Sequence, residues 1–184
     1  NEPLDELELD GADLSDLDLR GRSLVGTHLR RARLRGSQLA GADLSGASLA
    51  GADLTDANLD GAKVARADLA RADLSGASLR GADLRGSDLS FVKAEAARFD
   101  DANASGAVFA DGHFGRAHFD RATLASADFT RATLDGAVFD RAIMPEVTLY
   151  DARGDGASFA VPAGLRLRKM SSQLITLPSR RTSA

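Results

Sequence analysis

The sequence predicts an all-β protein in which the chain coils around a four-sided core, and three observations predict it. Apolar residues recur every five positions from Leu4 to Phe159 without an insertion or a deletion. A column of alanine stands two residues earlier and is unbroken from Ala42 to Ala82. Glycine is the commonest residue two positions later. Neither an α-helix nor a straight strand repeats every five residues, so the chain must turn a corner in every unit.

The apolar column supplies the centres of the core. If four units close one coil, residues twenty apart share a side, and leucine on one side gives way to phenylalanine between Leu79 and Phe99. Small residues at 94, 104 and 112 accompany the larger rings, which indicates volume balance in a packed core. The alternative is a ligand cavity at this change. The predicted core centres include Leu44, Leu54, Leu59, Leu79, Phe99, Phe109, Phe119, Phe129, Phe139 and Phe159.

The alanine and glycine columns suit the sides and corners of such a coil. Alanine fits an inward site where a larger group would collide, whereas glycine, aspartate, asparagine and serine favour corners. The units Ala52-Asp53-Leu54-Thr55-Asp56 and Ala57-Asn58-Leu59-Asp60-Gly61 show the pattern. This pattern resembles the pentapeptide-repeat family, whose motif is A-(D/N)-L-x-x. The resemblance implies a right-handed quadrilateral β-helix of about eight coils, which at about 4.8 Å per coil is a rod of roughly 38 Å.

The regular coil is predicted to cover residues 1–161, followed by a basic cap or tail over 162–184. Pro162 and Gly164 interrupt the alanine and apolar columns, and Leu165 and Leu167 are candidate cap residues. Exposed strand edges at the end of a solenoid recruit other chains, so a cap is physically required. A homodimer through this C-terminal end is one possible arrangement.

Composition excludes several functions. The chain has no cysteine, which excludes disulfides and thiol chemistry. No segment reaches the roughly 18 apolar residues that span a membrane, and the acidic start lacks the features of a signal peptide. We therefore expect a cytoplasmic protein with no membrane contact.

No catalytic, cofactor or metal site is predicted. His28, His113 and His118 each stand one residue before a centre and should point outward, and only the last two could approach each other. Two histidines without a third ligand are a weak metal site. Glycine-serine strings that resemble phosphate loops are merely the five-residue repeat. We expect that the chain is not an enzyme.

Charge is negative along the coil and positive in the tail. The net charge is −4, and residues 165–184 carry five bases and no acid, so the remainder is at −9. Summed over the four sides it is −2, −3, −3 and −1, so no side concentrates it. An acidic body repels phosphates, and we expect no direct contact with nucleic acid. The eight acids from Glu2 to Asp18 and the arginines from Arg22 to Arg35 could neutralise each other across neighbouring coils.

One acidic column is the candidate partner-binding site. It consists of Asp60, Asp100, Asp120 and Asp140, one position after the centres of one side, with Arg80 between the first two. Carboxylates stacked at about 4.8 Å repel each other, so an uncompensated column would indicate selection for binding. It is either a phosphate-mimicking stripe or a solvated face that nearby arginines such as Arg121 and Arg141 neutralise.

Function is predicted from the resemblance. The resemblance to the pentapeptide-repeat family implies a DNA-mimicking, non-enzymatic modulator of the antibiotic-resistance type, whose partner is bacterial DNA gyrase or topoisomerase IV. Three features depart from that group: the spread of charge, the lack of an inserted loop, and a tail that alternates like a strand over 165–170. The alternative is a scaffold or adaptor domain of a larger bacterial protein, for example a secretion-associated one, and a start without Met allows an excised domain.

Overall fold

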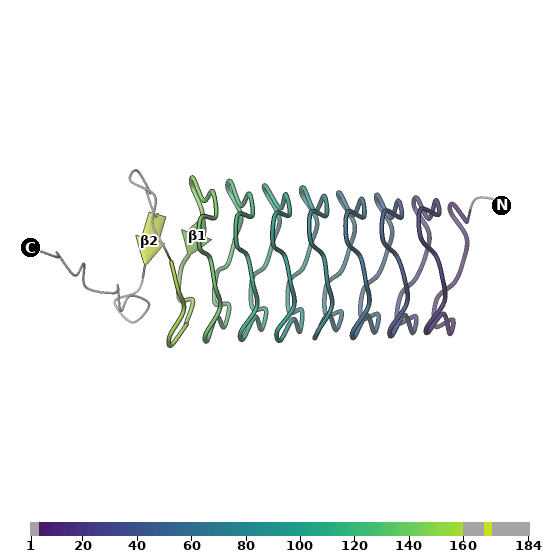
Figure 1. Cartoon of the computed structure of the whole chain (residues 1–184), viewed down its shortest axis with the longest axis horizontal. Helices are drawn as coiled ribbons and strands as arrows, with labels where there is room; N and C mark the ends of the chain where they lie inside the picture. Colours follow the sequence, from purple (N-terminus) through teal and green to yellow (C-terminus); the bar gives the residue numbers. More distant parts are fainter. Residues whose placement is uncertain (1–3, 160–167, 171–184) are drawn as a thin grey trace, which may run out of the picture.

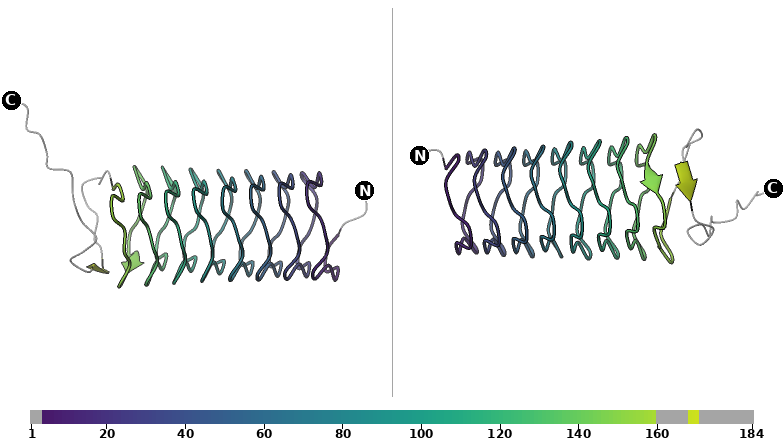
Figure 2. Two further views of the ribbon diagram at one scale, coloured as in Figure 1. Left: turned by 90° about the horizontal axis from the view of Figure 1, so that it is seen from below. Right: turned by 180° about the vertical axis from the view of Figure 1, so that it is seen from behind.

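The protein forms a straight rod, seen in a computed structural model that describes residues 4–159 and 168–170 (Figures 1 and 2). The chain returns to the same side every twenty residues. Parallel β-bridges join residues twenty apart, from Glu8 with His28 to Val138 with Ser158. The amide of Leu9 donates to the carbonyl of His28 at 2.7 Å, and the amide of His28 donates to the carbonyl of Leu7 at 2.8 Å. These bonds stack each coil on the next.

Extended strands are rare because each side of the coil is too short. Most sides contribute a single bridge, and the described residues contain two strands, β1 (Thr148–Leu149) and β2 (Arg168–Met170). They pair in parallel, with Thr148 opposite Arg168 and a shift in register before Leu149. Figure 1 shows β2 beside β1 at the end of the rod. Pro162, Gly164, Leu165, Leu167 and the proposed C-terminal dimer contact lie outside the described residues.

Most corners of the described coils are hydrogen-bonded turns. The amide of Ala42 donates to the carbonyl of Leu39 at 2.9 Å, and Gly41 between them has a φ of 67°. A positive φ at the third residue is the signature of a type II turn, and glycine adopts it without a steric penalty. Arginine and aspartate adopt it too, with φ of 55° at Arg31 and 57° at Asp56. The corner therefore prefers glycine but also accepts charged residues.

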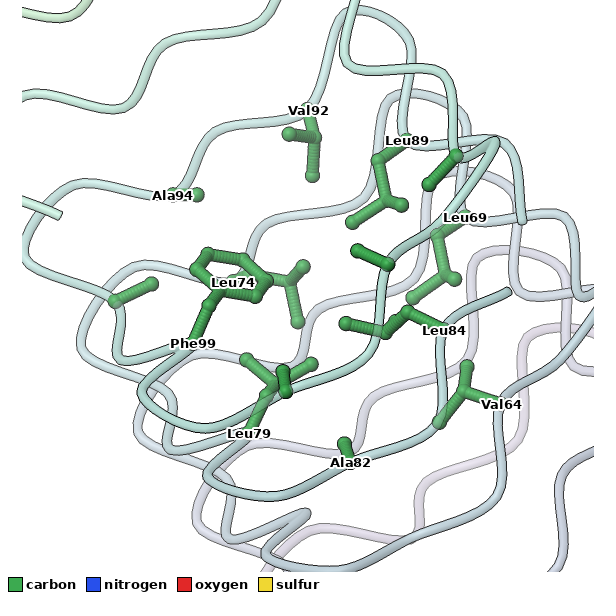
Figure 3. Close-up of a cluster of buried hydrophobic side chains, with 14 of the residues drawn as sticks. Val64, Leu69, Leu74, Leu79, Ala82, Leu84, Leu89, Val92, Ala94 and Phe99 are labelled. Carbon is green, nitrogen blue, oxygen red and sulfur yellow. The ribbon is translucent and has the colours of Figure 1, made fainter. Parts of the chain in front are cut away.

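The interior is filled by the apolar and alanine columns (Figure 3). The side chains labelled in the figure, from Val64 to Phe99, point inward from different sides of the coil. Of the ten predicted centres, nine are buried and Phe159 is partly buried. Rings on one side stack at the coil spacing, with centroids 4.7 Å apart for Phe99 and Phe119. Rings on the opposite side meet them edge to face, as Phe109 does with Phe119 at 5.9 Å and 89°.

Gly112 shows how the aromatic half is accommodated. A Cβ atom at this position would lie 2.5 Å from Cε2 of Phe114 and 3.1 Å from the carbonyl oxygen of Phe109. The alanine column is interrupted here because the ring occupies that space. Volume balance thus explains this small residue.

Candidate functional site

The structure stacks the acidic column along one edge of the rod. Its residues follow bridges that join Ser78 to Arg98, Arg98 to His118 and His118 to Val138. At one end, the Ser78 hydroxyl and the Arg80 amide donate to one oxygen of Asp60 at 2.5 and 3.0 Å. The carboxylate of Asp60 therefore binds the next coil through two hydrogen bonds.

Arginines neutralise the middle of the column. Asp100 is only 5% exposed, and its carboxylate accepts a hydrogen bond from Nε of Arg98 at 2.9 Å. Nε of Arg80 lies 3.6 Å from the same oxygen, so Arg80 forms an ion pair with a carboxylate of the column. Arg98 was not predicted. The sequence contains a signal for this pair, because an acid and an arginine two positions apart recur along the chain. Asp18 with Arg20 and Asp83 with Arg85 have this spacing and also form ion pairs.

The remaining carboxylates are also engaged. Arg121 pairs with Asp120 and donates from Nε and Nη2 to Asp101 at 2.7 Å each. Asp140 accepts a hydrogen bond from the hydroxyl of Ser158 at 2.7 Å. The predicted relief of the column by Arg121 is confirmed, whereas its role in binding a partner stays a prediction.

Ion pairs between neighbouring coils recur elsewhere on the rod. Nη2 of Arg33 lies 2.9 Å from the Asp13 carboxylate, as predicted for the acidic and basic clusters near the start. Arg131 and Asp111 pair in the same way at 2.5 Å. Because stacked positions are about 4.8 Å apart, an arginine side chain reaches the carboxylate of the adjacent coil. Part of the surface charge is therefore compensated locally.

Two of the ion pairs on the rod, one between coils and one within a coil, predict a loss of stability in acid. A hydrogen bond from Arg33 lowers the pKa of Asp13 to about 2, and one from Arg20 does the same for Asp18. Unfolded aspartate titrates near pH 3.9, so between roughly pH 4 and pH 2 the unfolded chain binds protons that the folded chain does not. The free energy of unfolding, measured in urea, should be constant from pH 7 to about pH 5 and fall towards pH 2.

Replacing both carboxylates provides the control. Asp13→Asn with Asp18→Asn should make the fall between pH 4 and pH 2 shallower, because two of the titrating groups are gone. An unchanged slope would show that other carboxylates cause the acid sensitivity.

Histidines form no metal site in the part of the chain that the structure describes. Nδ1 of His28 lies 3.0 Å from the Glu8 carboxylate, an ion pair only when the ring is protonated. Among residues 4–159 and 168–170, no group of three or more histidine, aspartate or glutamate side chains could hold a metal ion. Over the same residues, no helix is long and apolar enough to cross a membrane.

Bridges twenty residues apart, a turn in every five-residue unit and a core of leucine, phenylalanine and alanine define a four-sided solenoid of five-residue repeats. The sequence matches the Pentapeptide repeats family as eight copies over residues 12–51, 52–90 and 97–136, and the chain belongs to this family.

Solved structures of this family resemble the chain to different degrees. Trypsin-treated QnrB1, a plasmid-mediated fluoroquinolone resistance protein, aligns with a TM-score of 0.66 at 16% identity, covering 86% of this chain and 84% of that one. HetL from Nostoc sp. strain PCC 7120, which is involved in heterocyst differentiation regulation, is 31% identical over 85% of this chain and 86% of its own, with a TM-score of 0.34. No curated protein matches the sequence.

Proposed function

We propose that this chain is a non-enzymatic rod that binds a protein partner along its outer surface, and that the partner is bacterial DNA gyrase or topoisomerase IV. The observation that carries the proposal is the filled interior. Centres and alanines on all sides are buried, so the outer surface is what a partner can contact.

Shape and charge favour a topoisomerase as the partner. The fold is that of QnrB1, a fluoroquinolone resistance protein, over most of both chains. A negatively charged rod is steered towards a basic channel that normally receives DNA. The chain would then act as a DNA mimic in antibiotic resistance. This proposal places it in the bacterial cytoplasm, where its partner acts.

A supercoiling assay with purified gyrase, with and without a quinolone, tests the proposal. The chain should inhibit supercoiling or protect gyrase at micromolar concentration. Asp120→Asn with Asp140→Asn should raise the concentration for half-maximal effect by roughly tenfold, because two carboxylates of the column are lost. Asp100 is left intact, since removing it would leave Arg80 and Arg98 without their shared carboxylate.

Asp68→Asn with Asp88→Asn is the matched control. These two aspartates lie on a different side and removing them deletes the same charge. An equal loss in both double variants would mean that net charge, not the column, is responsible. Absence of inhibition and of protection at micromolar protein would exclude the topoisomerases.

The second candidate is a scaffold or adaptor domain of a larger bacterial protein. The compensation of the acidic column favours it, since Asp100 is buried between Arg80 and Arg98 and presents little charge to a partner. A folded rod that has no effect on gyrase would support this alternative.

A further inference from the structure

A groove with a volume of ≈ 720 Å³ follows one corner of the rod across several coils. It exists because side chains of very different size are stacked there. The floor of the groove consists of small residues, namely Ala50, Gly51 and Ala70. Arg30 and Arg31 lie on one side of this floor, and Arg71 and Phe91 lie on the other. The residues that line the groove come from five successive coils, four spacings of about 4.8 Å or roughly 19 Å, and none of them belongs to the acidic column.

Three arginines line this groove: Arg30, Arg31 and Arg71. Among the described residues, none of the three has a carboxylate within ion-pair distance, unlike most arginines elsewhere on the rod. Nε of Arg30 donates to the Ser48 hydroxyl at 2.9 Å. The lining carboxylate of Asp10 accepts the Arg30 backbone amide at 2.7 Å. Three guanidinium groups against one carboxylate leave a local charge of +2 on an acidic rod.

An exposed aromatic ring closes the other end. Phe91 is 49% exposed, although six of the other phenylalanines are buried in the core. It occupies the corner position with a φ of 57°, a left-handed conformation that a bulky residue seldom adopts. The guanidinium of Arg71 lies 5.2 Å from the centroid of its ring. Phe91 is not part of the buried core, so core packing does not explain why an aromatic residue occupies this left-handed corner.

We propose that this groove binds a nucleotide, with the phosphates between the arginines and the base against Phe91. Guanidinium groups bind phosphate oxygens through paired hydrogen bonds, and a base can stack on an aromatic ring or a guanidinium plane. The volume falls within the range of small-molecule sites. A di- or triphosphate fits a groove that has cations on both sides of a floor of small residues. An extended acidic peptide would bind the arginines but would make no stacking contact with the Phe91 ring. This site goes beyond the proposed interaction with a topoisomerase and does not depend on it.

Calorimetric titration of the full chain with ATP, adenosine and inorganic triphosphate tests the proposal. ATP should bind with a dissociation constant below about 100 μM at moderate salt, triphosphate more weakly, and adenosine not measurably. Arg31→Ala with Arg71→Ala should weaken ATP and triphosphate binding by about tenfold or more. Phe91→Ala should weaken ATP binding several-fold and leave triphosphate binding unchanged.

Arg66→Ala with Arg141→Ala is the matched control. Both residues occupy the same corner position, with φ of 57° and 60°, and lie outside the groove. This control should bind ATP like the parent chain, and circular dichroism should show that every variant keeps the fold. An absence of ATP binding at millimolar concentration overturns the proposal. An equal loss in the control also overturns it, as does a glutamate decapeptide that binds as tightly as ATP and is insensitive to Phe91→Ala.

Discussion

Phe119→Ala is expected to lower the free energy of unfolding by about 3 to 5 kcal/mol. The ring is fully buried and stacked between Phe99 and Phe139, with centroids 4.7 and 4.8 Å away. Phe109 and Phe129 contact it edge to face. Its backbone amide is bonded to the carbonyl of Val138 at 2.7 Å, so the coils cannot collapse into the cavity without losing ladder bonds. Urea denaturation of the parent and the variant measures the difference.

Phe91→Ala is the control for this prediction. The same atoms are removed from a half-exposed corner, so the loss should be below about 1 kcal/mol. Equal losses at 91 and 119 would show that stacking in the interior does not stabilise the rod.

Gly112→Ala is expected to cost about 1 to 3 kcal/mol although alanine is the usual residue of this column. The added methyl group would lie 2.5 Å from Cε2 of Phe114 and 3.1 Å from the carbonyl oxygen of Phe109. The latter atom belongs to the backbone and cannot move without disturbing the coil. Gly112 does not have a positive φ, so the effect is steric and not conformational.

A second substitution tests the cause. Phe114→Leu should be destabilising in the parent chain because it leaves a cavity, yet in the presence of Gly112→Ala it should restore stability, since the pair recreates the common Ala-x-Leu unit. The coupling energy from the four proteins should be about 1 kcal/mol or more. Strict additivity of the two single losses would contradict the proposed contact.

The core could be read from the sequence because the five-residue register is unbroken. Once Leu44 is placed, the inward position of every later centre follows, including Phe99 and Phe119, and the column of Asp60 follows with them. Small residues at the aromatic half, such as Gly112, were also interpretable, because a closed core has a fixed volume.

Pairing of the surface charges could not be read in the same way. An arginine side chain reaches the next coil, the previous coil or the residue two positions away, and the sequence does not rank these choices. The sequence pattern places Asp100 in an acidic stripe, but Arg98 beside it and Arg80 one coil away enclose it. The sequence pattern does not indicate the groove for a related reason, since the groove depends on side-chain sizes on adjacent coils at one corner.

The sequence alone thus carries the coil, its side-chain register and its family, because backbone hydrogen bonding and burial act identically in each repeat. The folded chain was needed to decide which outward side chains meet. Those contacts depend on the distance between neighbouring coils and on side-chain reach, and neither repeats every five residues.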